Sequence, residues 1–220
     1  MAALAQELAP RTYALEVARA QKDVVALEAI ALRDNRDAEK HVRLAYRRFH
    51  LASLTKHAEH FAAVAQSITA LLRNFGPKED ICLLKANLDG RFHRVERVKE
   101  ALRMCPSLAR RTAGRAILAD VDFQEGRYQD AHAALLTLIE QDRTWDNLAR
   151  LAYWHSKLGD CDVADRLYES AQHELTAKEL RSFAWLAALY GAAGDMAQQA
   201  RYQRAALQIN PMSQAIHLHL

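Results

Sequence analysis

The chain has 220 residues, a length that fits one or two globular domains or one elongated stack of repeats. Half of the residues are apolar, and with only 7 glycines and 4 prolines the sequence supplies long helices better than tight-turned sheets. The formal net charge of +3 is too small to imply nucleic-acid binding by itself. These properties predict an all-α protein.

Three features bear on the compartment. Cys82, Cys105 and Cys161 are an odd number without a CxxC pair, which predicts reduced thiols and no disulfide framework. The N-terminus has no basic residue before its apolar stretch, so it lacks the charge order of a secretory signal. The longest uncharged run, residues 61–72, is shorter than the roughly 20 residues of a membrane-spanning helix. We expect a cytoplasmic protein with no membrane partner.

Residues 1–77 predict helices separated by two polar breaks. These breaks, ARAQKDVV around Lys22 and SLTKHAEH around Lys56, are each flanked by segments with helical apolar periodicity. Their centres are 34 residues apart, but neither contains glycine. Helix pairs are therefore predicted here on spacing alone.

The next turns contain glycine. DGRFHRVERVKEAL predicts a turn at Gly90, and further turns follow at Gly126, Gly159 and Gly194, the last three being 33 and 35 residues apart. Glycine commonly ends a helix, and apolar-periodic segments lie on both sides of each turn. Ser107 and Thr144 are suitable caps for helices that follow. Each unit is predicted to be a helical hairpin.

The match extends to large and small residues in the two helices. The pairs Leu118-Ala119, Leu151-Ala152 and Leu186-Ala187 precede the turns by the same number of residues, and Ala131 and Ala164 follow two of them. Small residues let antiparallel helices approach closely while leucines fill the adjacent space.

These units resemble the tetratricopeptide repeat family, whose unit has about 34 residues. The third unit resembles it most, through Phe183, Leu186, Ala187, Tyr190, Gly194, Ala206 and Pro211. The resemblance is clearest over residues 78–211 and degenerate over 1–77, with 212–220 starting a further or capping helix. It implies a right-handed α-solenoid of antiparallel helix pairs, about six hairpins in a single repeat domain over residues 1–220.

The resemblance also implies where a partner binds. In the family the first helix of each unit lines a concave groove, which here would hold Tyr46, His50, Asp80, Asn87, Asp120, Phe123, Asp146, Tyr153 and Arg181. The alternative for Phe123 and Tyr153 is packing against neighbouring helices. The Lys and Asn with which some members bind a peptide carboxylate are replaced, in one unit, by Ala116 and Asp120.

Catalytic and metal sites are not predicted. Nucleophile motifs and phosphate-binding loops are missing, and no cofactor is expected. His57 and His60 are three residues apart and could share an ion, as could His217 and His219, but neither pair has a convincing third ligand.

A basic segment, residues 91–115, carries Arg91, Arg94, Arg97, Arg110 and Arg111. These side chains could bind phosphate or an acidic peptide. A solvated helix surface is the favoured interpretation, because aromatic residues for base stacking are scarce there.

The sequence thus predicts a non-catalytic scaffold that binds a protein or peptide in its groove. Two alternatives stay open: an adaptor for nucleic acid or another polyanion through the basic segment, and a docking or regulatory region of a longer enzyme. Residues 212–220 have no charged side chain other than two histidines, whereas terminal repeats normally have a polar outer face. This suggests a longer protein or self-association through the C-terminal helix.

Overall fold

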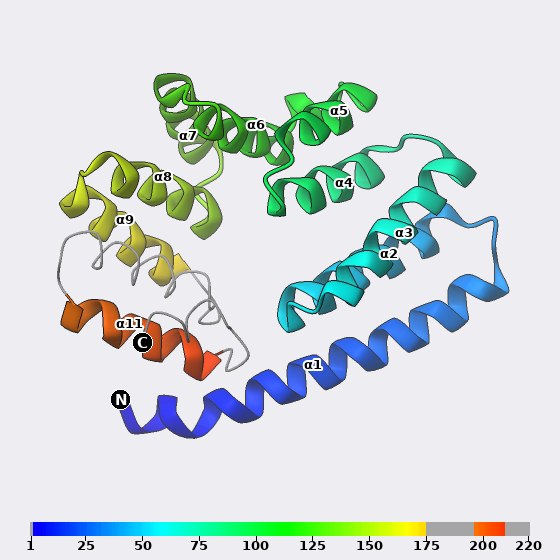
Figure 1. Cartoon of the computed structure of the whole chain (residues 1–220), viewed down its shortest axis with the longest axis horizontal. Coiled ribbons are helices and arrows are strands. Elements are labelled where there is room, and N and C mark those ends of the chain that lie inside the picture. The colour runs from blue at the N-terminus through cyan, green and yellow to red at the C-terminus, as the bar shows by residue number, and fades with distance from the viewer. Residues whose placement is uncertain (1, 175–195, 210–220) are drawn as a thin grey trace. The chain divides into compact units, whose positions relative to one another are not determined.

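The computed structural model describes residues 2–174 and 196–209, and within these ranges all regular structure is helical (Figure 1). The elements in chain order are α1 (Ala2–Arg33), α2 (Ala38–Thr55), α3 (Ala58–Phe75), α4 (Glu79–Arg91), α5 (Val95–Met104), the 3-10 turn η1 (Leu108–Arg110), α6 (Thr112–Gln124), α7 (Tyr128–Gln141), α8 (Trp145–Leu158), α9 (Cys161–Glu174) and α11 (Met196–Ile209). The predicted all-α class is confirmed.

Contacts divide the chain into two compact units. The first unit is Ala14–Ile117, and the second unit holds the described residues of Met1–Tyr13 and Leu118–Leu220. Each has its own apolar core and is described by itself below.

In the first unit, α2 packs against α3 and α4 packs against α5. The core between α2, α3 and α4 contains Ala45, Val64, Ile81 and Leu84, none of which is exposed to solvent. Burial of each larger aliphatic side chain contributes about 1.5–3 kcal/mol before entropy costs. The helical hairpins are thus held together by their apolar faces rather than by their surface charges.

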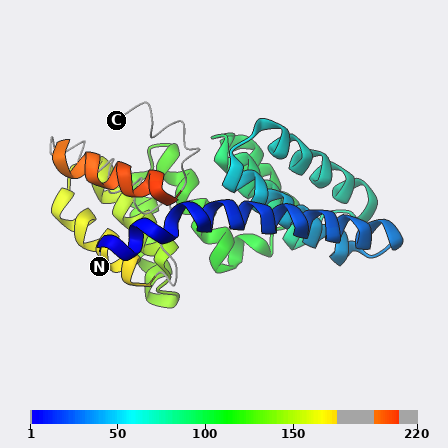
Figure 2. The ribbon, with the colours of Figure 1, turned by 90° about the horizontal axis from the view of Figure 1, so that it is seen from below.

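The turn between α2 and α3 lies where the sequence predicted it. Lys56 follows α2 in the left-handed conformation, with φ of 59°, and its amide donates to the Ala52 carbonyl at 2.9 Å. The turn predicted near Lys22 is absent, because α1 runs without interruption through that residue (Figure 2). No glycine or proline occurs near Lys22 to end the helix.

Two further local predictions were wrong. Gly90 lies inside α4, and the turn follows at His93, which adopts a φ of 54°. Ser107 precedes η1 instead of a long helix and makes no side-chain cap bond. A helix tolerates one glycine near its end at a cost of about 1 kcal/mol, so glycine alone did not locate this turn.

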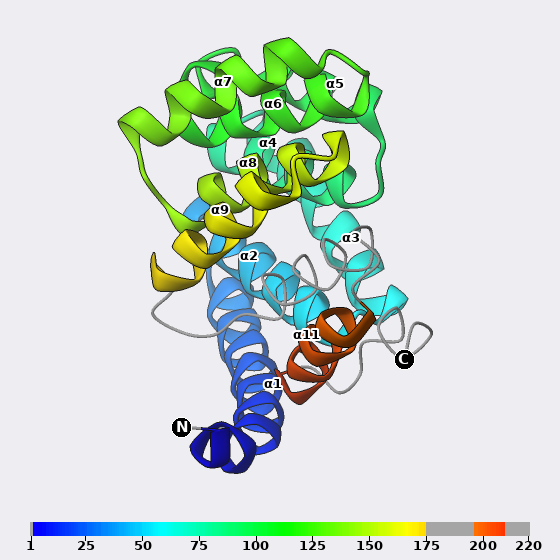
Figure 3. The same ribbon diagram turned by 90° about the vertical axis from the view of Figure 1, so that its left-hand side faces the viewer.

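In the second unit, α8 and α9 form the hairpin that the Leu-Ala pattern predicted, lying side by side in Figure 3. Ala152 of α8 and Ala164 of α9 are both fully buried in the same apolar cluster. The turn between them begins at Gly159, with φ of 90°. Thr144 caps α8 as predicted, its hydroxyl accepting from the Asn147 amide at 3.4 Å.

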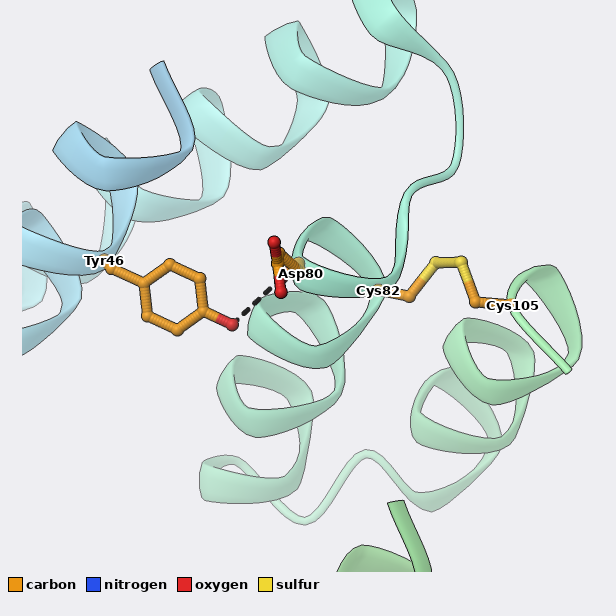
Figure 4. The surroundings of a disulfide bond; sticks show 4 residues. All are labelled: Tyr46, Asp80, Cys82 and Cys105. Carbon is orange, nitrogen blue, oxygen red and sulfur yellow. Dashed lines mark hydrogen bonds between the residues drawn. A yellow bond between two sulfur atoms is a disulfide. The ribbon is translucent and has the colours of Figure 1, made fainter. Parts of the chain in front are cut away.

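The cysteine prediction needs correction. Cys82 of α4 and Cys105, directly after α5, form a disulfide that closes a separation of 23 residues (Figure 4). Both are buried, whereas Cys161 is a free thiol. The packing of α4 on α5 brings the two sulfurs together, and such a contact between distant residues cannot be read from a cysteine count.

Candidate functional site

Five residues from two helices form what we call the α6–α8 face: Asp120 and Phe123 of α6, and Asp146, Arg150 and Tyr153 of α8. Asp120 and Phe123 are three residues apart on α6. On α8, Arg150 follows Asp146 by four residues and Tyr153 follows Arg150 by three. Residues at such spacings lie on one side of a helix. The Thr144 cap fixes where α8 begins and so sets the position of this stripe.

An ion-pair network occupies one half of the face. The Arg150 Nε lies 3.1 Å from Asp120 Oδ2, and its Nη1 binds the Asp146 carboxylate. Only 13% of the Arg150 side chain is exposed, against 41% for Asp120. Burial acts to lower the pKa of Arg150, but the two carboxylates outweigh burial and raise that pKa. Arg150 therefore stays charged and offsets part of the negative charge of Asp120 and Asp146.

Aromatic rings occupy the other half. Phe123 and Tyr153 meet edge to face at a centroid distance of 5.5 Å, and Phe123 also contacts the Tyr128 ring at 5.3 Å. The Lys157 ammonium lies 5.3 Å from the Tyr153 ring centroid, at the next position of the α8 stripe. Burial, and secondarily the Asp120 charge, raise the pKa of Tyr153, so its phenol remains a neutral hydrogen-bonding group near pH 7.

The face offers recognition chemistry rather than acid–base chemistry. Both of its carboxylates bind the same guanidinium, so neither is poised as an isolated base. The half-buried Phe123 and Tyr153 supply an apolar contact area with one polar tip, the type of surface that is enriched at protein interfaces. Sequence reasoning selected four of these residues and missed Arg150, although the Asp146–Arg150 spacing of four was a readable signal.

The predicted groove residues of the first unit lie on α2 and α4. The Tyr46 hydroxyl donates to the Asp80 backbone carbonyl at 3.0 Å, which ties α2 to the start of α4 (Figure 4). Burial, with a smaller effect of the Asp80 charge, raises the pKa of Tyr46 to about 12. His50 and Asn87 are half-buried on the same two helices, and Arg181 lies outside the described residues. Tyr46 thus has a structural role in addition to any role in binding.

The basic segment is divided among several elements. Arg91 stacks on Phe61, Arg94 stacks on Phe92 and lies 3.6 Å from Asp89, and Arg111 pairs with Glu79 at 2.9 Å. Arg97 and Arg110 are exposed and make no ion pair with another described residue. Internal partners therefore reduce the number of cations that remain available to a polyanion.

Within the described parts of the chain, no helix combines the length and apolarity that a bilayer span requires. Comparison with known proteins gives no match to a protein-family model or to a curated protein sequence.

Solved structures do match. A tetratricopeptide repeat protein from Parabacteroides merdae has a TM-score of 0.72 at 13% identity, over 96% of this chain and 84% of that one. A thermophilic tetratricopeptide repeat protein of Thermus thermophilus has a TM-score of 0.64 at 15% identity, over 83% of this chain and 96% of that one. The Cut9–Hcn1 hetero-tetramer of the APC/C has a TM-score of 0.68 at 15% identity, over 94% of this chain and 40% of that one. The chain therefore has the all-α helical-repeat fold of tetratricopeptide repeat proteins, as its Leu-Ala and glycine pattern indicated.

Proposed function

We propose that this chain is a non-catalytic interaction scaffold that binds a protein or peptide, and that the α6–α8 face is one of its contact surfaces. The observation that carries the proposal is the Phe123–Tyr153 pair beside the Asp120–Arg150–Asp146 network. Aromatic and arginine side chains contribute most to binding energy at interfaces. One of the structures with this fold is itself a hetero-tetramer of two proteins.

The face favours an occupant with an apolar side chain. Phe123 and Tyr153 can contact such a group, and Asp120 and Lys157, both partly exposed, flank them with opposite charges that can position a peptide backbone or polar side chain. The residues of the first unit, His50, Asn87 and Tyr46, are proposed contacts of the same partner or of a second one. Only the exposed part of Tyr46 is available, because its hydroxyl binds the Asp80 carbonyl.

A photo-crosslinking experiment tests the α6–α8 face. A photoreactive phenylalanine analogue replaces Tyr153, and in the control protein it replaces Leu136, an exposed apolar residue of α7 that is 43% accessible. We expect a partner to be captured at position 153 and not at 136. Its affinity, measured with purified components, should fall about tenfold or more in Tyr153→Ala or Phe123→Ala and remain unchanged in Leu136→Ala.

Two results would contradict this assignment. One is equal capture at both positions, and the other is a partner whose affinity survives both aromatic substitutions while circular dichroism shows unchanged helicity. A partner bound only through His50 or Asn87 would move the contact surface to the first unit.

Binding of a polyanion through residues 91–115 is the alternative function, and it is favoured only by the exposed Arg97 and Arg110. Affinity for a single-stranded RNA or heparin should then fall steeply with salt, and the Arg97→Ala, Arg110→Ala double variant should reduce that salt dependence. Salt-independent binding would exclude it.

The Cys82–Cys105 disulfide argues against the cytoplasmic location predicted from the sequence, because disulfides persist mainly in oxidising compartments. We propose that the redox state of Cys82 and Cys105 in the native cell distinguishes an oxidising compartment from the cytoplasm. Alkylation of the protein as it leaves its native cell, followed by mass spectrometry, should label Cys161 alone if the compartment is oxidising and all three cysteines if the chain works in the cytoplasm.

A further inference from the structure

Three potential metal ligands meet at the turn between α2 and α3. His57 precedes α3, Glu59 lies in its first turn, and one ligand atom from each of these two and from His60 lies within 4.8 Å of the others. His57 Nδ1 is 3.5 Å from Glu59 Oε1, and the two imidazole rings stack at 5.3 Å. No third ligand was predicted for this histidine pair, and in the structure Glu59 lies beside it.

A buried hydroxyl lies where it can select the tautomer of His60. Thr55 is 7% exposed, and its Oγ1 lies 3.0 Å from the Leu51 carbonyl and 2.7 Å from His60 Nδ1. A hydroxyl has one hydrogen, and donating it to the carbonyl leaves Oγ1 to accept from His60. A neutral His60 that donates this hydrogen bond carries its hydrogen on Nδ1 and keeps the lone pair of Nε2. Orientation of a histidine ligand by a hydrogen bond to its other ring nitrogen is typical of metal sites.

We propose that His57, Glu59 and His60 bind a zinc ion, with water as the fourth ligand. Two imidazoles and one carboxylate are donors that suit Zn²⁺, and three protein ligands with one open position form a known type of zinc coordination. Tetrahedral ligands at about 2.0–2.1 Å from zinc are about 3.4 Å apart, close to the separation of His57 and Glu59. The three ligand atoms, which lie within 4.8 Å of one another, must approach to this spacing, and the exposed side chains of His57 and Glu59 allow that movement.

Charge explains why the carboxylate is required. The N-terminus of α3 carries a partial positive charge that opposes a cation. Glu59 places a full negative charge in the first turn of that helix and offsets this repulsion. The bound ion would join His57, which directly follows the left-handed Lys56, to the first turn of α3, and the Thr55–His60 hydrogen bond would connect this turn to the end of α2.

The test uses the full chain without an affinity tag. Titration of zinc against a chromophoric chelator should show one site per chain, and Co²⁺ should give the intense visible absorption of tetrahedral coordination. His57→Ala and Glu59→Gln should each weaken zinc at least tenfold, whereas His173→Ala, which removes an exposed histidine of α9, should leave it unchanged. Thr55→Val should weaken it about tenfold and Thr55→Ser, which keeps the hydroxyl, should restore it.

A second measurement does not depend on affinity. Nitrogen-15 shifts of the metal-free protein should show His60 as the Nδ1–H tautomer, and zinc should shift its Nε2. The proposal is overturned by zinc affinity weaker than about 0.1 mM, by affinity that survives both the His57 and Glu59 substitutions, or by a His60 tautomer protonated on Nε2. Circular dichroism identifies any variant that has lost its helices. If the ligand variants do not fold, the tautomer of His60 in the original protein tests the proposal instead.

Discussion

Replacement of Gly114 by alanine should destabilise the first unit, although alanine is the better helix former. Gly114 is buried in the first turn of α6, and a Cβ atom there would lie 2.0 Å from the Leu108 carbonyl oxygen and 2.7 Å from its carbon. These are backbone atoms of η1, so relief requires η1 and α6 to separate by about 1 Å. Overpacking of this kind costs about 1–3 kcal/mol or more, and the helix-propensity gain of up to about 1 kcal/mol offsets only part of it. We expect a net loss of about 2 kcal/mol.

Gly90 supplies the matched control. It also lies in a helix of the first unit, but a Cβ there would meet only Val98 Cγ2 at 3.8 Å, an ordinary contact. Gly90→Ala should therefore leave stability unchanged or raise it by up to about 1 kcal/mol.

The two units can be monitored separately. All three tryptophans lie beyond residue 117, so their fluorescence reports on the second unit, while amide hydrogen exchange of α4 and α5 peptides reports on the first. Gly114→Ala should speed exchange in α4 and α5 more than it changes the fluorescence melt in urea, because η1 packs on the first-unit end of α6. Equal exchange in Gly114→Ala and Gly90→Ala would refute the close approach of η1 and α6.

Three further predictions concern covalent and polar contacts. Joint replacement of Cys82 and Cys105 by alanine should lower the unfolding free energy of the first unit by about 3 kcal/mol, because the disulfide closes a loop of 23 residues and so restricts the unfolded chain. A reductant should have the same effect on the original protein. In Cys161→Ala the reductant should still have its full effect, because Cys161 is a free thiol. Arg150→Met should cost about 2 kcal/mol in the fluorescence melt, because it leaves two carboxylates facing each other. The pKa of Tyr46 near 12 means that the folded state keeps a proton which the unfolded state releases above about pH 10. Stability should therefore fall between about pH 10 and 12, and Tyr46→Phe should remove that part of the fall and the last phenolate step in absorbance.

The sequence predicted the fold where local chemistry determines it. Gly159 ends α8 and Thr144 begins it, and the paired Ala152 and Ala164 fill the space between α8 and α9, so pattern and structure agree. At Gly90 the pattern was misleading, because the left-handed residue of this turn is His93 and not a glycine. The uninterrupted α1 shows that a repeat spacing of 34 residues does not by itself locate the end of a helix. A capping residue or a helix breaker must also be present at that position.

Long-range partners account for most of what sequence reasoning missed. The Asp120–Arg150 pair joins residues 30 apart, and the Cys82–Cys105 bond joins residues 23 apart. Neither pairing follows from periodicity, because each depends on the angle at which two helices pack. Glu59 is different, since it lies between His57 and His60 in sequence and could have been considered as a ligand from spacing alone.

The internal pairing of charges on the α6–α8 face has a consequence for binding. Arg150 is nearly buried between its two carboxylates, so a partner that contacts this face displaces few counterions. Binding energy must then come mainly from Phe123 and Tyr153, with Lys157 as an exposed cation near the rings. Apolar contacts are not weakened by salt, whereas contacts between exposed charges are screened. The affinity of a partner for this face should therefore change little between low and physiological salt, and a steep decrease would place the contact on exposed arginines of the first unit instead.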